Sequence, residues 1–418
     1  MAKIKPDVRK KQPKSPSPRG RRKQPRKRPK PTLTPRRKQP EPSLTLSLSL
    51  HDHLPIDLVE EILCRLPVKP LIQLRCVCKS WNSLISENSN FAKKHLLLST
   101  SNQARHHLIL KTLKFLNLQS PISTIFNSGD ATISMYSLRE ILKKGESDCD
   151  GGGYVSTCDG ILCYKIDTSS AVLFNPSIRK FIILPPLEFP DQTQANFLYT
   201  LAYDSFINNY KVIVLIDHRN KREVNILTLG TSYWRRIDFP SHEQLLLDKN
   251  SNFELMSTST GIFINDSVNW LTLELIVSLD LKKESYQKLS VPVSNVRFGS
   301  SCLVTLGTLK GCLSLLIPMM NTFSDIWIMK EFGNEKSWIK LLSIPYMEAW
   351  CPFRYSKVLY ISEDNQVLME TFICRKLKYM LVVYDCINHT FNFPEFQNKI
   401  PDYGMVPEIY VESLISPF

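Results

Sequence analysis

A repeat with a period near 50 residues constrains the fold of this 418-residue chain more than any other feature. Five segments show a strand pattern, a polar turn and a second strand pattern that opens with an aromatic residue, and each closes on a proline. They span residues 172–185, 226–240, 277–292, 326–345 and 382–394, and their prolines are 55, 52, 53 and 49 residues apart. Units of this length with about four strands are typical of propeller blades, so we predict an all-β, propeller-like domain.

Two local patterns refine this prediction. Residues 410–415 are strand-like and terminal, and propellers often close by pairing both ends of the chain, so we predict that this segment closes the ring. Asn265-Asp266-Ser267 lies between strand patterns at 261–264 and 268–271, which predicts a tight hairpin turn.

Residues 54–98 have a helical period instead. Leu58, Ile62 and Leu66 recur every four residues and predict a helix that Pro67 ends. Further short helical stretches are expected from Pro70, around Trp81 and, after a polar turn at 86–90, from Phe91. Helices this short bury little surface, so we expect several apolar side chains to serve a partner, and the alternative is a small self-contained bundle.

The net charge of +14 is concentrated at the N-terminus. Residues 1–40 hold 17 Lys and Arg and one acidic residue, which leaves 36 basic and 38 acidic residues in the rest. We expect a disordered, proline-rich basic arm and linker over residues 1–50, including a stretch at 44–50 whose leucines alternate like a strand or an extended linker. The candidates for a nuclear-import signal are Arg21, Arg22, Lys23, Arg26, Lys27 and Arg28, and the alternative is a solvated tail.

Patterns of catalytic or metal chemistry are not evident in the sequence. It lacks a G-x-S-x-G elbow, a phosphate-cradling glycine loop and an H-E-x-x-H pair. The cysteine count of 11 is odd, and the single residue between Cys76 and Cys78 is a poor zinc spacing. His106 and His107 are expected at the surface, on opposite faces of a strand. We therefore predict no catalytic residue, no metal and no cofactor, and no apolar run long enough to span a bilayer.

The helical region resembles the F-box of plant-type F-box proteins in the segments 54–63, 65–69, 76–81 and 91–95. The resemblance implies docking onto a Skp-family adaptor, and through it onto a cullin scaffold and a RING subunit. The residues that the motif assigns to adaptor binding are Leu54, Pro55, Leu58, Ile62, Leu66, Pro67, Leu71, Val77 and Trp81.

The remainder is similar to the F-box-associated domain. The matching segments are 156–163, 175–177, 201–204, 210–212, 234–237, 268–271, 326–330, 383–385 and 410–414. Kelch blades carry paired glycines, whereas this chain has 14 glycines and one cluster, Gly151-Gly152-Gly153, so the number of blades stays open.

The sequence thus predicts an α+β multidomain protein with a basic arm and linker (1–50), an all-α F-box (51–98) and an all-β propeller-like domain (105–418). The implied function is that of a non-catalytic substrate-recognition adaptor of an SCF-type cullin-RING ubiquitin ligase, in the nucleus and cytoplasm, with an unknown target and no membrane. The alternative is a nuclear, nucleic-acid-associated binding protein that uses the arm, which the nearly neutral body disfavours.

Overall fold

The computed structural model describes most of the chain beyond residue 54. The described ranges are 55–111, 116–127, 134–137, 155–166, 169–188, 195–218, 221–245, 260–293, 304–319, 322–346, 354–373, 378–394 and 406–418. The chain divides into two units, Met1–His53 and Leu54–Phe418, and every described residue belongs to the second. The predicted basic arm, its import candidates and the alternating leucines at 44–50 lie outside the described residues.

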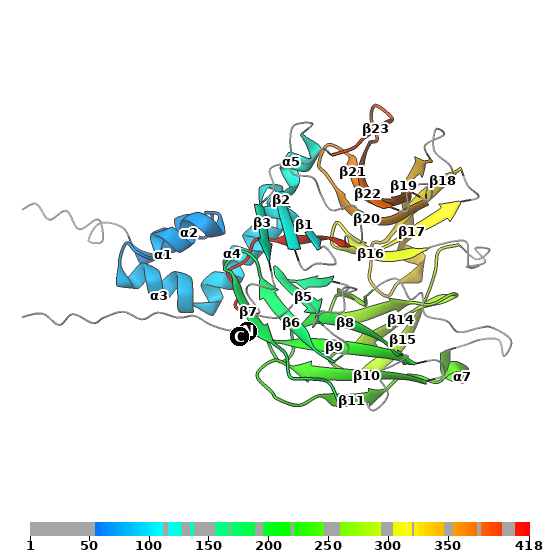
Figure 1. Ribbon diagram of the computed structural model, residues 1–418, viewed down its shortest axis with the longest axis horizontal. Helices are drawn as coiled ribbons and strands as arrows, with labels where there is room; N and C mark the ends of the chain where they lie inside the picture. Colours follow the sequence, from blue (N-terminus) through cyan, green and yellow to red (C-terminus); the bar gives the residue numbers. More distant parts are fainter. Residues whose placement is uncertain are drawn as a thin grey trace, which may run out of the picture. The chain divides into compact units, whose positions relative to one another are not determined.

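Short helices begin the described part of the chain, as the spacing of its leucines predicts (Figure 1). They are α1 (Ile56–Leu63), α2 (Val68–Leu74), α3 (Lys79–Glu87) and α4 (Ser89–Thr100), followed by the 3-10 turn η2 (Gln103–Arg105). We call α1 to α4 the helical module. Its buried residues, among them Leu63, Leu71 and Phe91, form one hydrophobic cluster with residues of the β-domain. The module therefore packs onto that domain and is not a self-contained bundle.

Two prolines set the boundary between α1 and α2. A residue before a proline avoids the helical conformation, and α1 ends at Leu63 where the spacing predicts Leu66. The Leu66 N–H donates to the Leu63 carbonyl at 3.0 Å in a tighter final turn. α2 then starts at Val68, with Pro67 in the N-cap position and Pro70 in the first turn, where its missing N–H costs no bond within the helix.

A single residue, Asn88, separates α3 from α4 where we predict a turn over 86–90. Its side-chain oxygen accepts a hydrogen bond from the Phe91 N–H at 2.9 Å. Asparagine is among the preferred N-cap residues because it satisfies a donor that the first helical turn leaves free, so α4 can start directly after α3.

The strands form six antiparallel sheets of four strands each within the described ranges. Blade 1 holds β4 (Val155–Cys158), β5 (Ile161–Lys165), β6 (Ala171–Asn175) and β7 (Lys180–Ile183). Blade 2 holds β8 (Ala195–Asp204), β9 (Asn209–His218), β10 (Lys221–Thr228) and β11 (Arg235–Asp238). Blade 3 holds β12 (Ile262–Ile264), β13 (Ser267–Leu271), β14 (Leu275–Asp280) and β15 (Ser285–Ser290).

The other three sheets continue the series. Blade 4 holds β16 (Thr305–Leu309), β17 (Cys312–Met319), β18 (Phe323–Met329) and β19 (Trp338–Pro345). Blade 5 holds β20 (Arg354–Ile361), β21 (Gln366–Ile373), β22 (Lys378–Asp385) and β23 (Thr390–Asn392). Blade 6 holds β24 (Val406–Val411), β1 (His106–Lys111), β2 (Leu116–Pro121) and β3 (Ser134–Ser137). The short helices α5 (Ile122–Phe126) and α7 (His242–Leu245) and the 3-10 turn η3 (Glu335–Ser337) lie between strands.

The blades close into a ring. The strands β4, β8, β12, β16, β20 and β24 contact one another in that order, and β24 contacts β4 again. These strands are therefore the innermost of their blades. The structure confirms the predicted propeller and determines its blade number, six in the described part of the chain.

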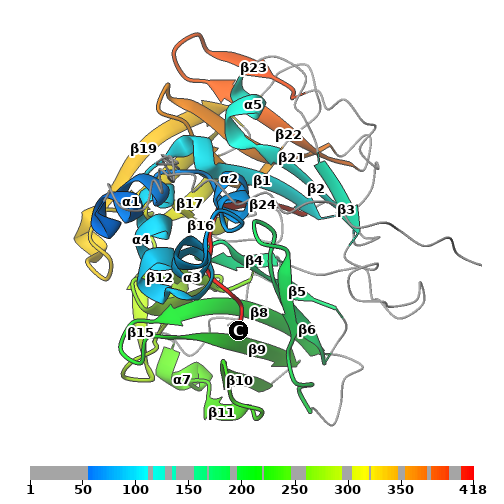
Figure 2. The ribbon, with the colours of Figure 1, turned by 90° about the vertical axis from the view of Figure 1, so that its left-hand side faces the viewer.

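The last strand closes the ring by pairing with the first, from His106 opposite Val411 to Lys111 opposite Val406 (Figure 2). We predict a closing strand at 410–415, and the observed strand both begins and ends four residues earlier, at Val406 and Val411, so the prediction is wrong for residues 412–415. Pro407 accounts for the difference at the start, because a proline in a strand pattern argues against a strand unless it lies at the edge of a sheet. β24 is such an edge strand.

Burial depends on the position of a strand in its blade. β6 and β13 are buried over their whole length, whereas the outer strands β7 and β11 are largely accessible. The middle strands of a blade are covered on both faces by neighbouring blades. Their sequences are therefore continuous apolar runs, such as 212–216 in β9. The repeat in the sequence therefore reflects the change from buried middle strands to accessible outer strands in each blade.

Two tryptophans at the outer strands bond a blade to the preceding one. Trp234, just before β11, donates from Nε1 to the Pro185 carbonyl at 3.0 Å, and Trp338 of β19 donates to the Ser290 carbonyl at the same distance. The two pairs occupy equivalent positions in blades 1 and 2 and in blades 3 and 4. Both tryptophans open the second strand pattern of their repeat, and each of them forms a contact between blades.

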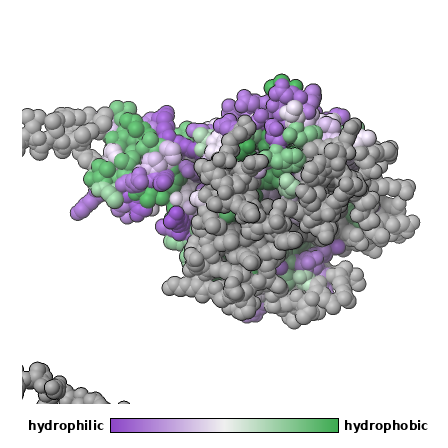
Figure 3. Space-filling model, turned by 45° about the horizontal axis from the view of Figure 1, so that its top comes forward, coloured by the Kyte–Doolittle hydropathy of each residue, from purple (hydrophilic) through white to green (hydrophobic). Residues whose placement is uncertain are grey.

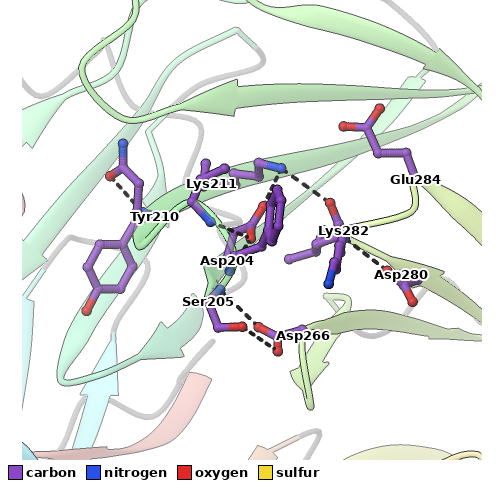
Figure 4. Close-up of polar contacts among 12 residues, drawn as sticks. Asp204, Ser205, Tyr210, Lys211, Asp266, Asp280, Lys282 and Glu284 are labelled. Carbon is purple, nitrogen blue, oxygen red and sulfur yellow. Dashed lines mark hydrogen bonds and ion pairs between the residues drawn. The ribbon is translucent and has the colours of Figure 1, made fainter.

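The predicted hairpin turn joins β12 and β13 of blade 3 and is hydrogen-bonded to blade 2. Ile264 pairs with Ser267, and Asn265 and Asp266 between them have φ angles of 48° and 54°, as a two-residue turn with both residues left-handed requires. The Asp266 carboxylate accepts hydrogen bonds from the backbone N–H and the hydroxyl of Ser205, at 3.1 and 2.8 Å (Figure 4).

A buried ion pair lies beside this turn. Lys211 Nζ is 2.6 Å from the Asp204 carboxylate and also donates to the Leu281 carbonyl of blade 3 at 3.3 Å (Figure 4). Asp204 in turn accepts from the N–H groups of Phe206 and Ile207. Every partner in this cluster is hydrogen-bonded inside the fold, so it joins two blades and is not an exposed reactive site.

Candidate protein-binding site

Helix α1 is apolar on two adjacent faces. Val59 and Leu63 face the core and are 7% and 2% exposed, whereas Leu58 and Ile62 are 51% and 55% exposed. Residues four apart lie on the same side of a helix, so each pair forms a stripe. One stripe is enough to attach a helix to its own core, and the second is therefore available to another protein.

Two further side chains share this degree of exposure. Ile56 at the start of α1 is 54% exposed, and Val77 between α2 and α3 is 57% exposed. We call Ile56, Leu58, Ile62 and Val77 the exposed apolar set. Figure 3 shows hydrophobic surface on the helical module, at the left of the view. Half-exposed aliphatic side chains in a module of this size mark a site of association.

The structure separates the residues that the motif assigns to adaptor binding. Pro55, Leu58, Ile62, Pro67 and Val77 are exposed, Leu66 and Trp81 are partly buried against the core, Leu71 is fully buried, and Leu54 lies outside the described residues. Leu71 thus supports the module from inside. The motif-based selection leaves out Ile56, which does not belong to the row of residues 58, 62 and 66, and only its exposure distinguishes it.

Charged residues connect α1 to α4. Lys94 Nζ is 3.3 Å from Glu60 and 2.9 Å from Glu61, and Arg65 is 3.1 Å from Glu61. The hydrogen bond from Lys94 is the main cause of the lowered pKa of Glu61. These pairs are largely exposed and contribute little to stability, but they orient α1 on the module.

The carbonyls of the loop between α1 and α2 accept hydrogen bonds from α4 and from η2, which leads into the propeller. Arg105 donates to the Arg65 carbonyl and, at 2.9 Å, to the Ser99 hydroxyl. His95 Nε2 is 2.9 Å from the Leu66 carbonyl. A carbonyl can only accept, so this nitrogen carries the proton; burial lowers the pKa of His95 and favours the neutral ring.

A cavity of about 860 Å³ lies where the inner strands meet beside α4. Leu96 and Thr100 of α4 line it together with inner-strand residues, including Phe263, Lys357 and Glu408. Lys357 and Glu408 form an ion pair at 2.6 Å. Apolar walls with a few fixed charges suit the binding of a peptide segment or a small molecule.

The adjacent histidines of β1 have separate partners. His106 Nδ1 is 2.7 Å from the Tyr360 hydroxyl, and His107 Nε2 is 3.2 Å from Glu412. They point to opposite faces, as predicted, but the expectation that both lie at the surface is wrong for His107, which is 7% exposed because β24 and the segment after it cover it.

Searches for other kinds of site cover the described residues alone. Among them no three His, Cys, Asp or Glu side chains are grouped as a metal site would need. Likewise, none of the helices described is both long and apolar enough to cross a membrane.

Comparison with known proteins agrees with this architecture. Residues 52–93 match the F-box domain, and residues 115–408 match the F-box associated beta propeller domain. The chain belongs to the F-box protein family. Its relatives include the Arabidopsis thaliana F-box/kelch-repeat protein At3g23880, 32% identical over 382 residues that cover 87% of this chain and 96% of the relative.

More distant similarities follow. The Arabidopsis thaliana F-box protein CPR1 is 26% identical over 342 residues, 76% of this F-box protein and 79% of the relative. The solved β-propeller domain of Myceliophteria thermophila Cps50 (Swd1) has a TM-score of 0.37 and 10% identity, covering 67% of this chain and 81% of that one. A likeness this weak carries no argument about function.

Proposed function

We propose that this F-box protein is the substrate-recognition adaptor of an SCF-type cullin-RING ubiquitin ligase. Its F-box binds a Skp-family adaptor, which connects it to the cullin and RING subunits. The observation that carries the proposal is the second apolar stripe of α1, where Leu58 and Ile62 keep half of their surface exposed beside a buried stripe. Burying such side chains against a partner is favourable by roughly 25 cal/mol for each Å² removed from water.

The propeller then holds a target protein. Its cavity beside α4 and the turns around it are made by several blades, so sequence changes in loops can alter specificity without loss of the fold. In this proposal the chain positions the target protein, and other subunits carry out the chemistry of ubiquitin transfer.

The basic arm has a separate role in this proposal. Its charge lies within residues 1–40, outside both modules, and the rest of the chain is nearly neutral. We assign it to nuclear import, with the protein distributed between nucleus and cytoplasm. A fluorescent fusion that lacks residues 19–30 is expected to lose nuclear enrichment, and an unchanged distribution would assign the arm another role.

Titration calorimetry with a plant Skp-family protein tests the adaptor site. The double variant Leu58→Ala, Ile62→Ala is expected to bind at least about 30-fold more weakly, because even one hot-spot side chain contributes on the order of 2 kcal/mol. The matched control is Ile339→Ala, Ile387→Ala, which truncates two exposed isoleucines of blades 4 and 5. Equal affinity of a folded Leu58, Ile62 variant and the control would refute the assignment.

Reconstituted ubiquitination tests the division of labour. Once a target is found by proximity labelling, the full chain is expected to support its modification, and residues 1–104 are expected to bind the adaptor without doing so. Equal modification of the target by both would show that the propeller is not the recognition element.

A further inference from the structure

The chain does not end with the closing strand. Residues 412–418 follow β24, and we call them the tail. The Glu412 N–H donates to the Arg105 carbonyl at 2.9 Å, and its carboxylate accepts from the Val68 N–H at 3.1 Å and contacts His107 Nε2 at 3.2 Å. One residue therefore bonds the linker η2, the first residue of α2 in the F-box and a strand of blade 6.

Blade 1 holds the next residues of the tail. Asn175 of β6 donates through Nδ2 to the carbonyls of Ser413 and Ile415, at 3.0 and 2.8 Å. A Cβ on Gly160, in the β4–β5 turn, would lie 2.4 Å from the Val411 carbonyl oxygen and 2.5 Å from Ser413 Cβ. The path of the tail is thus fixed by a glycine and a buried amide.

The apolar tail residues join the two modules. Leu414 and Ile415 are each 9% exposed and belong to the same hydrophobic cluster as Val59 and Leu63 of α1 and Ile161 of blade 1. This cluster is continuous across the F-box, the tail and the first two blades. The F-box therefore rests on a surface that is complete only when the C-terminal segment is in place.

The electrostatics favour an ionised Glu412. Burial alone would raise the pKa of its carboxyl, but hydrogen bonds from His107 and from the Val68 N–H, together with the nearby charge of Arg105, lower it below the usual value. The first amides of a helix lack partners within the helix, so a carboxylate satisfies the Val68 N–H well.

We propose that Glu412 is a positioning residue that makes the placement of the F-box depend on closure of the propeller. Its carboxylate reaches the loop between α1 and α2 from the residue directly after the closing strand, while Arg105 and His95 hold the carbonyls of the same loop. A ring that is not closed lacks this bond and the tail cluster, and its F-box has no fixed orientation. The consequence for ubiquitin transfer, a fixed distance between adaptor and target, rests on the proposed function.

Single-molecule energy transfer on the full chain tests the placement itself. Fluorophores on Ser86 of α3 and Ile387 of the β22–β23 turn, both exposed, report the separation of F-box and propeller. The narrow distribution of the parent chain is expected to broaden in Glu412→Ala and to stay narrow in Glu412→Gln, which keeps an acceptor oxygen. The matched control is Glu408→Ala, which removes a carboxylate of the closing strand β24 and its bond to Lys357.

Hydrogen exchange reports the individual bond. The Val68 amide is expected to exchange roughly tenfold faster or more in Glu412→Ala, as for the loss of one hydrogen bond to a charged acceptor. If that variant does not fold, Val68→Pro removes the donor at a first helical position, where proline is tolerated, and is expected to broaden the distribution in the same way.

An unchanged distribution in folded Glu412→Ala, or equal broadening in Glu408→Ala, would overturn the proposal. Neither measurement requires the adaptor, so failure here is distinct from failure of the proposed function. Affinity for the Skp-family protein is expected to remain within about twofold in Glu412→Ala, because Glu412 does not belong to the exposed apolar set and changes away from an interface usually have effects within about 0.5 kcal/mol.

Discussion

The F-box and the blades differ in the exposure of their apolar side chains. Leu58 and Ile62 of α1 keep half of their surface in water, whereas Val214 and Leu215 of β9 are completely buried. Both segments are apolar at successive positions. The difference is that β9 is covered by neighbouring blades on both faces, while α1 packs on the buried core of the helical module on one side and, within the described residues, leaves Leu58 and Ile62 half exposed on the other.

This contrast shows where the fold is complete by itself. Each blade buries its faces against the next, and the ring needs nothing more than both ends of the chain. The F-box is attached to the ring through α4, the first residue of α2 and the tail, and the exposed stripe of α1 is left for a partner. Stability and binding are therefore carried by different residues of the same short helix.

Deletion of residues 406–418 is expected to have the largest effect. It removes the strand that pairs with β1 and the buried residues Tyr410, Leu414 and Ile415. Because blades bury their faces only against neighbours, the loss of cooperative thermal unfolding is expected for the whole propeller. Differential scanning calorimetry measures it, with deletion of residues 1–50 as the control; an unchanged transition would mean that the ring does not depend on its closing strand.

Two alanine substitutions distinguish the roles of the buried and the exposed stripe of α1. Leu63→Ala is expected to lower the free energy of unfolding by about 3 kcal/mol, because it opens a cavity at a buried site. Leu58→Ala is expected to change it by less than about 0.5 kcal/mol, since the side chain is half exposed. Urea denaturation of both variants provides the comparison, which equal losses would contradict.

Close packing between blades predicts a smaller effect for a glycine. A Cβ on Gly261 would lie 2.7 Å from Thr200 Oγ1, Trp270 Nε1 and Val268 Cγ1, so Gly261→Ala is expected to destabilise the chain by about 2 kcal/mol through overpacking. On Gly307 the nearest atom would be Ser314 Oγ at 3.4 Å, an ordinary contact, and Gly307→Ala serves as the control. Equal melting temperatures for both variants would show that the blade 2 and blade 3 contact is looser than described.

The buried pair of Asp204 and Lys211 predicts the smallest effect, a dependence on pH. Burial alone would raise the pKa of Asp204, but the hydrogen bond from Lys211 and the amides of Ile207 and Phe206 lower it below the usual value. A lowered folded-state pKa gives stability that is present above the unfolded value, near pH 4, and is lost as the pH falls through the folded value.

Urea midpoints measured from pH 6 to pH 2.5 check this expectation. Asp204→Asn is expected to flatten the acid limb of the profile, because protonation of Asp204 then no longer contributes to the loss of stability at low pH. The matched variant is Asp266→Asn, because the Asp266 carboxylate accepts a hydrogen bond from Ser205 at the surface. Parallel profiles for the parent chain and Asp204→Asn would contradict the role of this pair.

The sequence was sufficient for five of the six blades, because each of them carries its own outer strand with an aromatic residue and a closing proline. The sixth is built from β24 and the three strands after η2, so no repeat marks it in the chain. The terminal strand and a strand at His106 and His107 are predicted separately, and Pro407 obscures where the terminal strand begins.

The binding site could be predicted in part. The motif selects the apolar residues of the helices, but their exposure depends on how the module packs on the propeller, which turns Leu71 inward and Ile56 outward. Glu412 lies in the segment 410–414 that resembles the F-box-associated domain, but its partner Val68 is 344 positions away in the sequence, so the contact between them has no local signal. Contacts of this range follow from the closed ring and cannot be read from spacing.

The contrast between an exposed F-box stripe and completed blades is tested most directly by hydrogen exchange with and without a plant Skp-family protein. On saturation with it, deuterium uptake is expected to fall in peptides covering residues 55–63 and 75–81, which hold the exposed apolar set, and to stay unchanged in blades 3 to 5. If the complex forms and protection appears in those blades, or the F-box peptides exchange as before, the exposed stripe of α1 is not the surface that binds the adaptor.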